Sequence, residues 1–161
     1  MCKIFAYLKH KLAKKLIHEI LKEITETAIN SYPKEHWTPL IKFIDWIEAT
    51  KNFGEMKVDE FPESNMISFP YMVESDLVDE FRVVLQQLKV MPIFDWTEWE
   101  KGKVVIGGKL KTHKLTLFEC CKMFTALIRS DRFIEGQLVG SFKNGLVLSL
   151  LKRIEQIIRE N

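Results

Sequence analysis

The sequence predicts a mainly α-helical protein, a compact bundle of about six helices with at most a minor β-hairpin. Apolar residues recur every three or four positions over most of the chain, as they do on the buried face of a helix. Hydrophobic residues make up 47% of the 161 residues and charged residues 29%, which is the balance of a globular protein. A chain of this length is expected to form one domain.

The first thirty residues are predicted to form one long amphipathic helix. Apolar residues recur every four positions from Phe5 to Ala28, and Pro33 ends the pattern. We therefore divide the chain into an amphipathic N-terminal helix, residues 1–32, which is an appendage or part of the bundle, and a single helical domain over residues 33–161. The lysine face and the leucine and isoleucine face fit a membrane surface or a partner helix. We favour packing on the same domain or dimerisation, which makes a homo-oligomer or a protein partner the expected use of this helix.

Turn and capping signals place the other helices. Asp95 and Thr116 are each followed three residues later by a glutamate, as in a capping box. Helices are predicted over residues 35–50, after Ser75, from Asp95, from Thr116, from Ser130 or Asp131 to about Phe142, and from Leu146. Residues 53–71 are predicted to be loops with one or two short strands, and residues 101–114 a basic loop or a small hairpin.

Composition narrows the class of protein. No apolar run approaches the roughly 20 residues that cross a bilayer, and lysines interrupt the apolar residues near the N-terminus, unlike a signal peptide. Cys2, Cys120 and Cys121 are odd in number and two are adjacent, so we expect reduced thiols in a cytoplasmic protein. The four histidines and the cysteines show no metal-ligand spacing, so neither a metal nor a cofactor is predicted.

Charge is unevenly distributed although the net charge is only +2. Residues 1–22 carry +5, residues 23–80 carry −9 and residues 81–161 carry +6. Attraction between these parts on folding explains the pattern most simply, and a basic surface for phosphate or an acidic partner is the alternative. No segment has the basic density typical of proteins that bind nucleic acid.

Four charged residues cluster beside an apolar helix: Arg129, Asp131, Arg132 and Glu135. Two arginines near a helix start favour an anion such as phosphate or carboxylate. Asp131 and Glu135 are four apart, hence on one face of a helix, where they could share a proton or a metal. The structural alternative is that Asp131 caps a helix and the other charges pair with neighbouring segments.

A second cluster combines Asp95 with two indoles, Trp96 and Trp99. The indoles could stack on a base or hold a cation. Packing in the core with the indole N–H groups satisfied is the structural alternative. Asp95 is expected to cap a helix, or else to orient one of the two arginines across the fold.

The two clusters, taken in order, resemble a bacterial and phage family known as domain of unknown function 6508. The residues that carry the resemblance are Phe94-Asp95-Trp96 with Trp99, followed by Arg129, Asp131-Arg132-Phe133 and Glu135-Gly136. The resemblance covers roughly residues 37–158. The family has no assigned activity. Some members look to be joined to macrodomains, which bind or hydrolyse ADP-ribose derivatives, so the resemblance implies a nucleotide-linked role. The predicted basic N-terminal helix of this chain lies outside the resemblance.

Two hypotheses follow. The first is a small binding or interaction module. It recognises an anionic ligand, a nucleotide or an ADP-ribose-like molecule, through Arg129 and Arg132, and Trp96 or Trp99 stacks on the ligand. Alternatively, the module binds a protein partner. The second is a small hydrolase that acts on an ADP-ribose-like substrate, with Asp131 and Glu135 as acid and base. The first is favoured because the sequence holds no complete set of nucleophile, base and orienting group.

Overall fold

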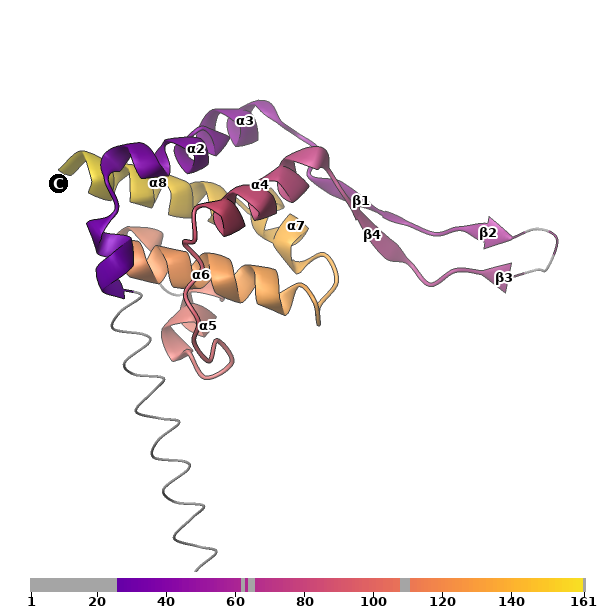
Figure 1. Cartoon of the computed structure of the whole chain (residues 1–161). Coiled ribbons are helices and arrows are strands. Elements are labelled where there is room, and N and C mark those ends of the chain that lie inside the picture. Colours follow the sequence, from indigo (N-terminus) through magenta and orange to yellow (C-terminus); the bar gives the residue numbers. More distant parts are fainter. Residues whose placement is uncertain (1–25, 62, 64–65, 108–110, 161) are drawn as a thin grey trace, which may run out of the picture.

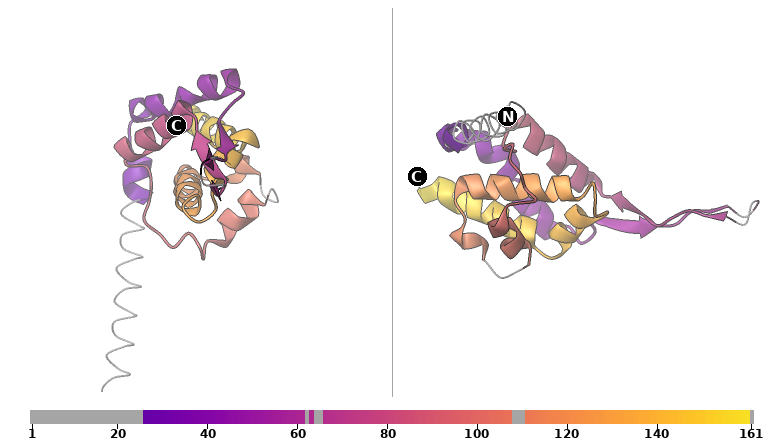
Figure 2. Two further views of the ribbon diagram at one scale, coloured as in Figure 1. Left: turned by 90° about the vertical axis from the view of Figure 1, so that its right-hand side faces the viewer. Right: turned by 90° about the horizontal axis from the view of Figure 1, so that it is seen from below.

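A nearly buried helix organises the molecule. The computed structural model describes residues 26–61, 63, 66–107 and 111–160. Within them, α6 (Leu117–Ser130) is buried from Phe118 onward except at Glu119 and Arg129. The left view of Figure 2 shows α6 nearly end-on with other helices around it. The predicted mainly α-helical fold is confirmed, although the sequence assigned α6 one inner face and the structure buries it on most sides.

The start of α6 is fixed by the predicted capping box. The Glu119 backbone N–H donates to the Thr116 hydroxyl at 3.2 Å, and the Thr116 N–H donates to the Glu119 carboxylate at 3.0 Å. Partial burial acts to raise the pKa of Glu119, but hydrogen bonds from Lys101 and the Thr116 backbone outweigh it and lower the pKa. The box therefore joins the cap of α6 to Lys101, whose ammonium lies 2.6 Å from the same carboxylate.

We expect Thr116→Ala to lower the free energy of unfolding by about 1 kcal/mol, because one backbone N–H at the helix start loses its acceptor. The Glu119 contribution should be present above the unfolded carboxyl pKa of about 4.3 and be lost as the pH falls through the lower folded pKa. Urea unfolding at neutral pH and in acid measures both effects. The exposed Thr27→Ala is the control, and an equal loss in it would contradict the capping role.

Phenylalanine rings join the helices around α6. Phe81, on α4 (Asp76–Gln87), is fully buried. Its ring meets those of Phe43, Phe124 and Phe142 edge-on, with centroids 5.2, 5.3 and 5.2 Å away. These rings come from α3 (Phe43–Ala49), α6 and α7 (Gln137–Lys143), so one cluster holds four helices together.

The helix predicted over residues 35–50 is present but interrupted, and the last helix begins where the sequence predicts it. The helix predicted over residues 35–50 is divided into η1 (Lys34–Trp37), α2 (Thr38–Ile41) and α3. Pro39 lies in the first turn of α2, where its missing backbone N–H leaves no helical hydrogen bond unmade. Inside one continuous helix the same proline would remove a hydrogen bond, so the predicted helix is divided here. The last helix, α8 (Leu146–Glu160), starts at the predicted residue after the Asn144-Gly145 turn.

The region after Trp96 was predicted wrongly. Asp95 does not start a helix; it accepts hydrogen bonds from the Thr97 backbone and hydroxyl and closes a turn. The helix α5 (Glu100–Ile106) occupies part of the predicted basic loop, and η2 (Thr112–Lys114) follows. Gly102 and Val105 are poor helix formers, but both are buried against the body, so packing outweighs propensity.

The described residues between 54 and 74 form a two-stranded arm that leaves the bundle between α3 and α4 (Figure 1). At its base, β1 (Gly54–Lys57) pairs antiparallel with β4 (Tyr71–Glu74), and farther out β2 (Glu60–Phe61) pairs with β3 (Met66–Ile67). The expected minor hairpin is thus present, and it projects from the body (Figure 1).

The N-terminal helix is described only at its end. Residues 26–31 are helical, Ile29 is buried in the core, and the helix ends before Pro33 as predicted. Residues 1–25, which carry most of the predicted amphipathic stripe, lie outside the described residues. In the described part of the chain, no helix is both long and apolar enough to cross a membrane.

Candidate anion-binding site

A cavity of about 380 Å³ lies beside the end of α6. It is lined by residues from α4, α6, the turn after α6 and the segment around Trp96: Gln86, Met91, Trp96, Thr125, Ile128, Arg129, Arg132 and Phe133. Three of the residues selected from the sequence, Arg129, Arg132 and Trp96, therefore border one hollow. The described residues that line it include two arginines and no acidic residue.

Arg129 is held in place by a backbone group. It lies in the last turn of α6, and its Nη1 donates to the carbonyl of Phe94 at 3.3 Å. This contact uses one of the five N–H donors of the guanidinium. Within the described residues, no carboxylate lies within ion-pair distance of Arg129 or Arg132. Arg82 is the contrast, because its guanidinium pairs with both Glu74 and Asp131.

Arg132 and Phe133 lie on a turn, residues 131–136, that joins α6 to α7. The sequence predicted a helix here, from Ser130 or Asp131, but α7 begins only at Gln137. Gly136 has a φ of +78°, a left-handed conformation that side chains disfavour, and a Cβ there would lie 2.7 Å from the methyl of Met72. The turn therefore directs Arg132 and Phe133 outward, to the edge of the cavity.

The two predicted carboxylates support this turn. Asp131 accepts from Arg82 at 2.7 Å and from the backbone N–H of Leu138, in the first turn of α7, at 2.8 Å. Glu135 accepts from the backbone N–H of Met72 at 2.6 Å. Neither lines the cavity. Because residues 131–136 are not helical, the spacing of four does not place the two carboxylates on one helix face.

The two indoles of the second cluster have different surroundings. Trp96 borders the cavity, half-buried, and its ring lies 6.2 Å from that of Phe133 at an angle of 30°. Trp99 packs edge-on against Phe94 at 5.5 Å, and the ammonium of Lys122 lies over both rings, 4.3 Å from Trp99. Trp96 is thus placed to stack on a ligand, whereas Trp99 packs within the body.

Sequence reasoning did not select the rest of the lining. Met91, Thr125 and Ile128 supply an apolar wall, and the Thr125 hydroxyl is already bonded to the carbonyl of Cys121. Gln86 and Phe133 are exposed at the edge. Phe133 had a usable signal, since it lies inside the Asp131-Arg132-Phe133 cluster. Ile128 lies at a helix position whose apolar spacing is indistinguishable from that of core residues, and Gln86, Met91 and Thr125 belong to no polar or aromatic cluster in the sequence.

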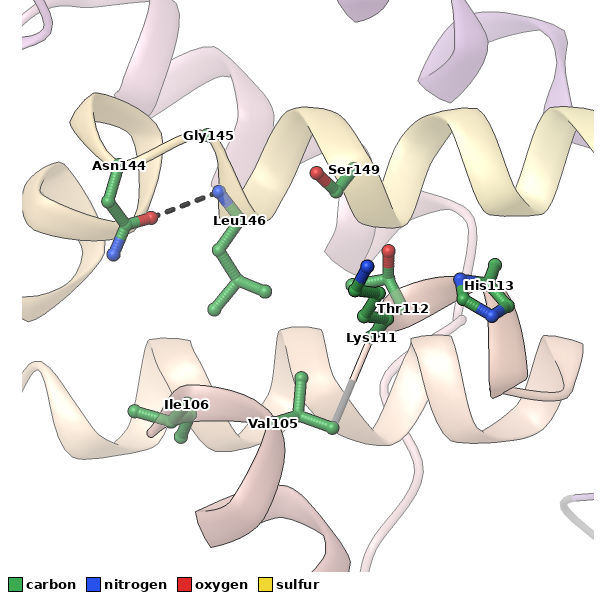
Figure 3. Close-up of a pocket in the computed structure, with 9 residues that line it drawn as sticks. All are labelled: Val105, Ile106, Lys111, Thr112, His113, Asn144, Gly145, Leu146 and Ser149. Atoms are coloured by element: carbon green, nitrogen blue, oxygen red, sulfur yellow. Dashed lines mark hydrogen bonds between the residues drawn. The ribbon is translucent and has the colours of Figure 1, made fainter. Parts of the chain in front are cut away.

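A larger hollow, of about 500 Å³, lies between α5, η2 and the start of α8 (Figure 3). Its lining includes Lys111, Thr112, His113 and Ser149. Residues 108–110, which connect α5 to Lys111, lie outside the described residues. The candidate site is built on the cavity beside Arg129, because two arginines and two aromatic rings of the described residues line it together.

Within the described residues, neither the cysteine thiols nor the potential metal ligands form a second candidate site. Burial raises the pKa of the Cys120 thiol to about 12 and that of Cys121 well above its usual value, so neither is a thiolate at neutral pH. Among the described residues, no three His, Cys, Asp or Glu side chains come together as metal ligands.

Comparison with known proteins adds one finding. Residues 32–160 match a family described as a family of unknown function (DUF6508). No curated protein and no solved structure matches the chain. The matched range covers the bundle, the arm and every residue of the candidate site, and it excludes the predicted N-terminal helix up to Ser31.

Proposed function

The chain belongs to a family of unknown function (DUF6508), and from its cavity we propose that it is a binding module for a small anionic ligand with a flat ring, a nucleotide or an ADP-ribose-like molecule. The observation that carries the proposal is the pair of arginines, Arg129 and Arg132, at one cavity with no carboxylate partner among the described residues. Uncompensated guanidinium groups attract anions, and their forked N–H donors suit phosphate oxygens.

The shape and lining of the cavity support the same ligand class. A volume of about 380 Å³ lies within the range of small-molecule sites. Trp96 and Phe133 offer ring faces on which a base could stack, and Met91 and Ile128 offer apolar surface beside them. In the proposed arrangement, Arg129 and Arg132 hold the phosphate groups and Trp96 holds the base.

Hydrolysis by Asp131 and Glu135 is the less favoured alternative. Their carboxylates are engaged by Arg82, by Leu138 and by Met72, and they do not line the cavity. A general acid or base must reach the group whose proton it transfers. Binding without turnover is therefore the function that this geometry favours.

Calorimetric titration of the full chain with AMP, ADP-ribose and inorganic phosphate tests the proposal. We expect saturable binding, with the two ring-bearing ligands binding more tightly than phosphate. Arg132→Ala should weaken it about tenfold or more, because a charge-assisted contact contributes about 1.5–3 kcal/mol. Arg132 is exposed and has no ion pair within the described part of the chain, so the fold should be unaffected.

Arg159→Ala is the matched control, because Arg159 is also an exposed arginine, near the end of α8, and lies outside the cavity lining. Equal weakening in both variants would indicate a general charge effect and contradict the proposed site. Absence of binding by all three ligands would reject this ligand class. Turnover of ADP-ribose that Asp131→Asn abolishes in a folded protein would favour the hydrolase instead.

A further inference from the structure

The arm carries apolar side chains that its own molecule leaves uncovered. Phe69 is 94% exposed and Ile67 69%, and Met56 and Val58 are about half exposed. The arm extends away from the helices in both Figure 1 and the right view of Figure 2. A two-stranded hairpin without a third strand or a packed helix is marginally stable in water. The arm therefore has the composition of an element that packs against another surface.

The charge of the arm restricts what that surface can be. Between Gly54 and Pro70 the sequence of the arm holds four acidic residues, Glu55, Asp59, Glu60 and Glu63, and one lysine, Lys57. Side-by-side pairing of two such arms would bring like charges together, which opposes association. A receiving surface with exposed positive charge and an apolar floor complements the arm instead.

Such a surface lies on the helical body, where α5 and η2 pass beside α8. The hollow of Figure 3 and a neighbouring one of about 250 Å³ share Thr112, His113 and Ser149 in their linings, so they form one groove. In Figure 3, Val105 and Leu146 face each other across the first hollow.

The described residues that line the groove include three cationic side chains, Lys111, Lys152 and Arg153, together with His113, and none of these described residues is acidic. Lys152 is paired with Glu48, whereas Lys111 has no ion pair with a described residue. The neighbouring Lys114 is also exposed and without one.

We propose that the acidic, apolar arm of one chain docks into the basic groove of a second copy of the same chain, in a reciprocal two-fold dimer. From Gly54 to Phe61 the arm extends about 25 Å at strand spacing, which approaches the diameter of a small domain. A two-fold exchange uses both arms and both grooves, so it closes at two copies. Phe69 and Ile67 meet the apolar floor, and the arm carboxylates meet the lysines at its edge.

Light scattering after size-exclusion chromatography of the full chain tests the proposal. Wild type should have the mass of a dimer and shift toward monomer as salt is raised. Ile67→Ser/Phe69→Ser should be monomeric. The matched control is Val83→Ser/Ile93→Ser, which removes two exposed apolar side chains from the body and should remain dimeric.

Charge exchange identifies the two surfaces. Glu60→Lys/Glu63→Lys on the arm and Lys111→Glu/Lys114→Glu at the groove should each be monomeric, because like charges then face each other. Neither pair of changes removes an ion pair seen in the described residues. Mixing the two variants should restore a dimer that contains one of each, since both of its arm–groove contacts again join opposite charges.

Any of the following results would overturn the proposal: a monomeric wild type, a dimer that survives Ile67→Ser/Phe69→Ser, or a mixture of the charge variants that stays monomeric. A dimer sensitive to the arm changes but not to Lys111→Glu/Lys114→Glu would also overturn it and indicate pairing between arms. A dimer lost only on removal of residues 1–30 would assign association to the N-terminal segment.

Discussion

Replacing both cavity arginines, in Arg129→Met/Arg132→Met, should weaken binding of AMP or ADP-ribose by at least about a hundredfold. Each guanidinium contact with a phosphate contributes about 1.5–3 kcal/mol, and the double variant removes two of them. Methionine keeps much of the apolar stem, so the packing of the half-buried Arg129 is largely retained. Calorimetric titration measures the loss directly.

The matched control removes two positive charges elsewhere. Lys51→Met/Arg159→Met changes two exposed residues that lie outside the cavity lining and carries the same net charge as the test variant. It should bind as wild type does, within about twofold, once long-range attraction is screened by salt. Affinity that falls equally in both double variants would mean that net charge, not the cavity, determines binding.

Arg82→Met should lower the free energy of unfolding by about 3 kcal/mol. Arg82 is the shared partner of Glu74 and Asp131, whose side chains are only 16% and 11% exposed. Without the guanidinium, two poorly hydrated carboxylates face each other with no counter-charge, and removing one partner of a buried pair costs about 3–5 kcal/mol. The partial exposure of the site places the expected loss at the low end. Urea unfolding at neutral pH gives the value.

A second variant tells charge from packing. Arg82→Met/Glu74→Gln removes one of the two stranded carboxylates, so it should recover part of the lost stability. Arg159→Met, whose parent residue pairs with Glu155 on the exposed side of α8, should cost less than about 0.5 kcal/mol. If Arg82→Met were equally mild, the junction of arm, α4 and the 131–136 turn would not depend on this ion pair.

Helices with strong boundary signals could be predicted from the sequence. The capping box at Thr116, the Asn144-Gly145 turn and Pro33 each fixed an end, because local hydrogen bonding or a missing N–H decides those positions. The segment after Asp95 could not be predicted in the same way. Its helix, α5, contains Gly102 and Val105, and it forms because these residues pack against Trp99 and the body, which is a tertiary effect.

The sequence selected three of the residues that line the cavity, but it did not predict how the selected residues are arranged. Arg129, Arg132 and Trp96 meet at one cavity, because α6, the following turn and the Trp96 segment converge there. Trp99 and the carboxylates of Asp131 and Glu135 have structural contacts instead. Sequence spacing could not separate these groups, since the difference depends on a turn at residues 131–136 and on Arg82, which is distant in sequence.

The resonances of the arginine side chains test the central claim most directly. The chain has five arginines, so their Nε–Hε signals can be assigned by replacing one arginine at a time and followed by NMR while ADP-ribose is added. We predict saturable shifts at Arg129 and Arg132, with a common dissociation constant, and no comparable change at Arg159. Unchanged signals at Arg129 and Arg132, or shifts of similar size at all five arginines, would contradict an anion site at this cavity.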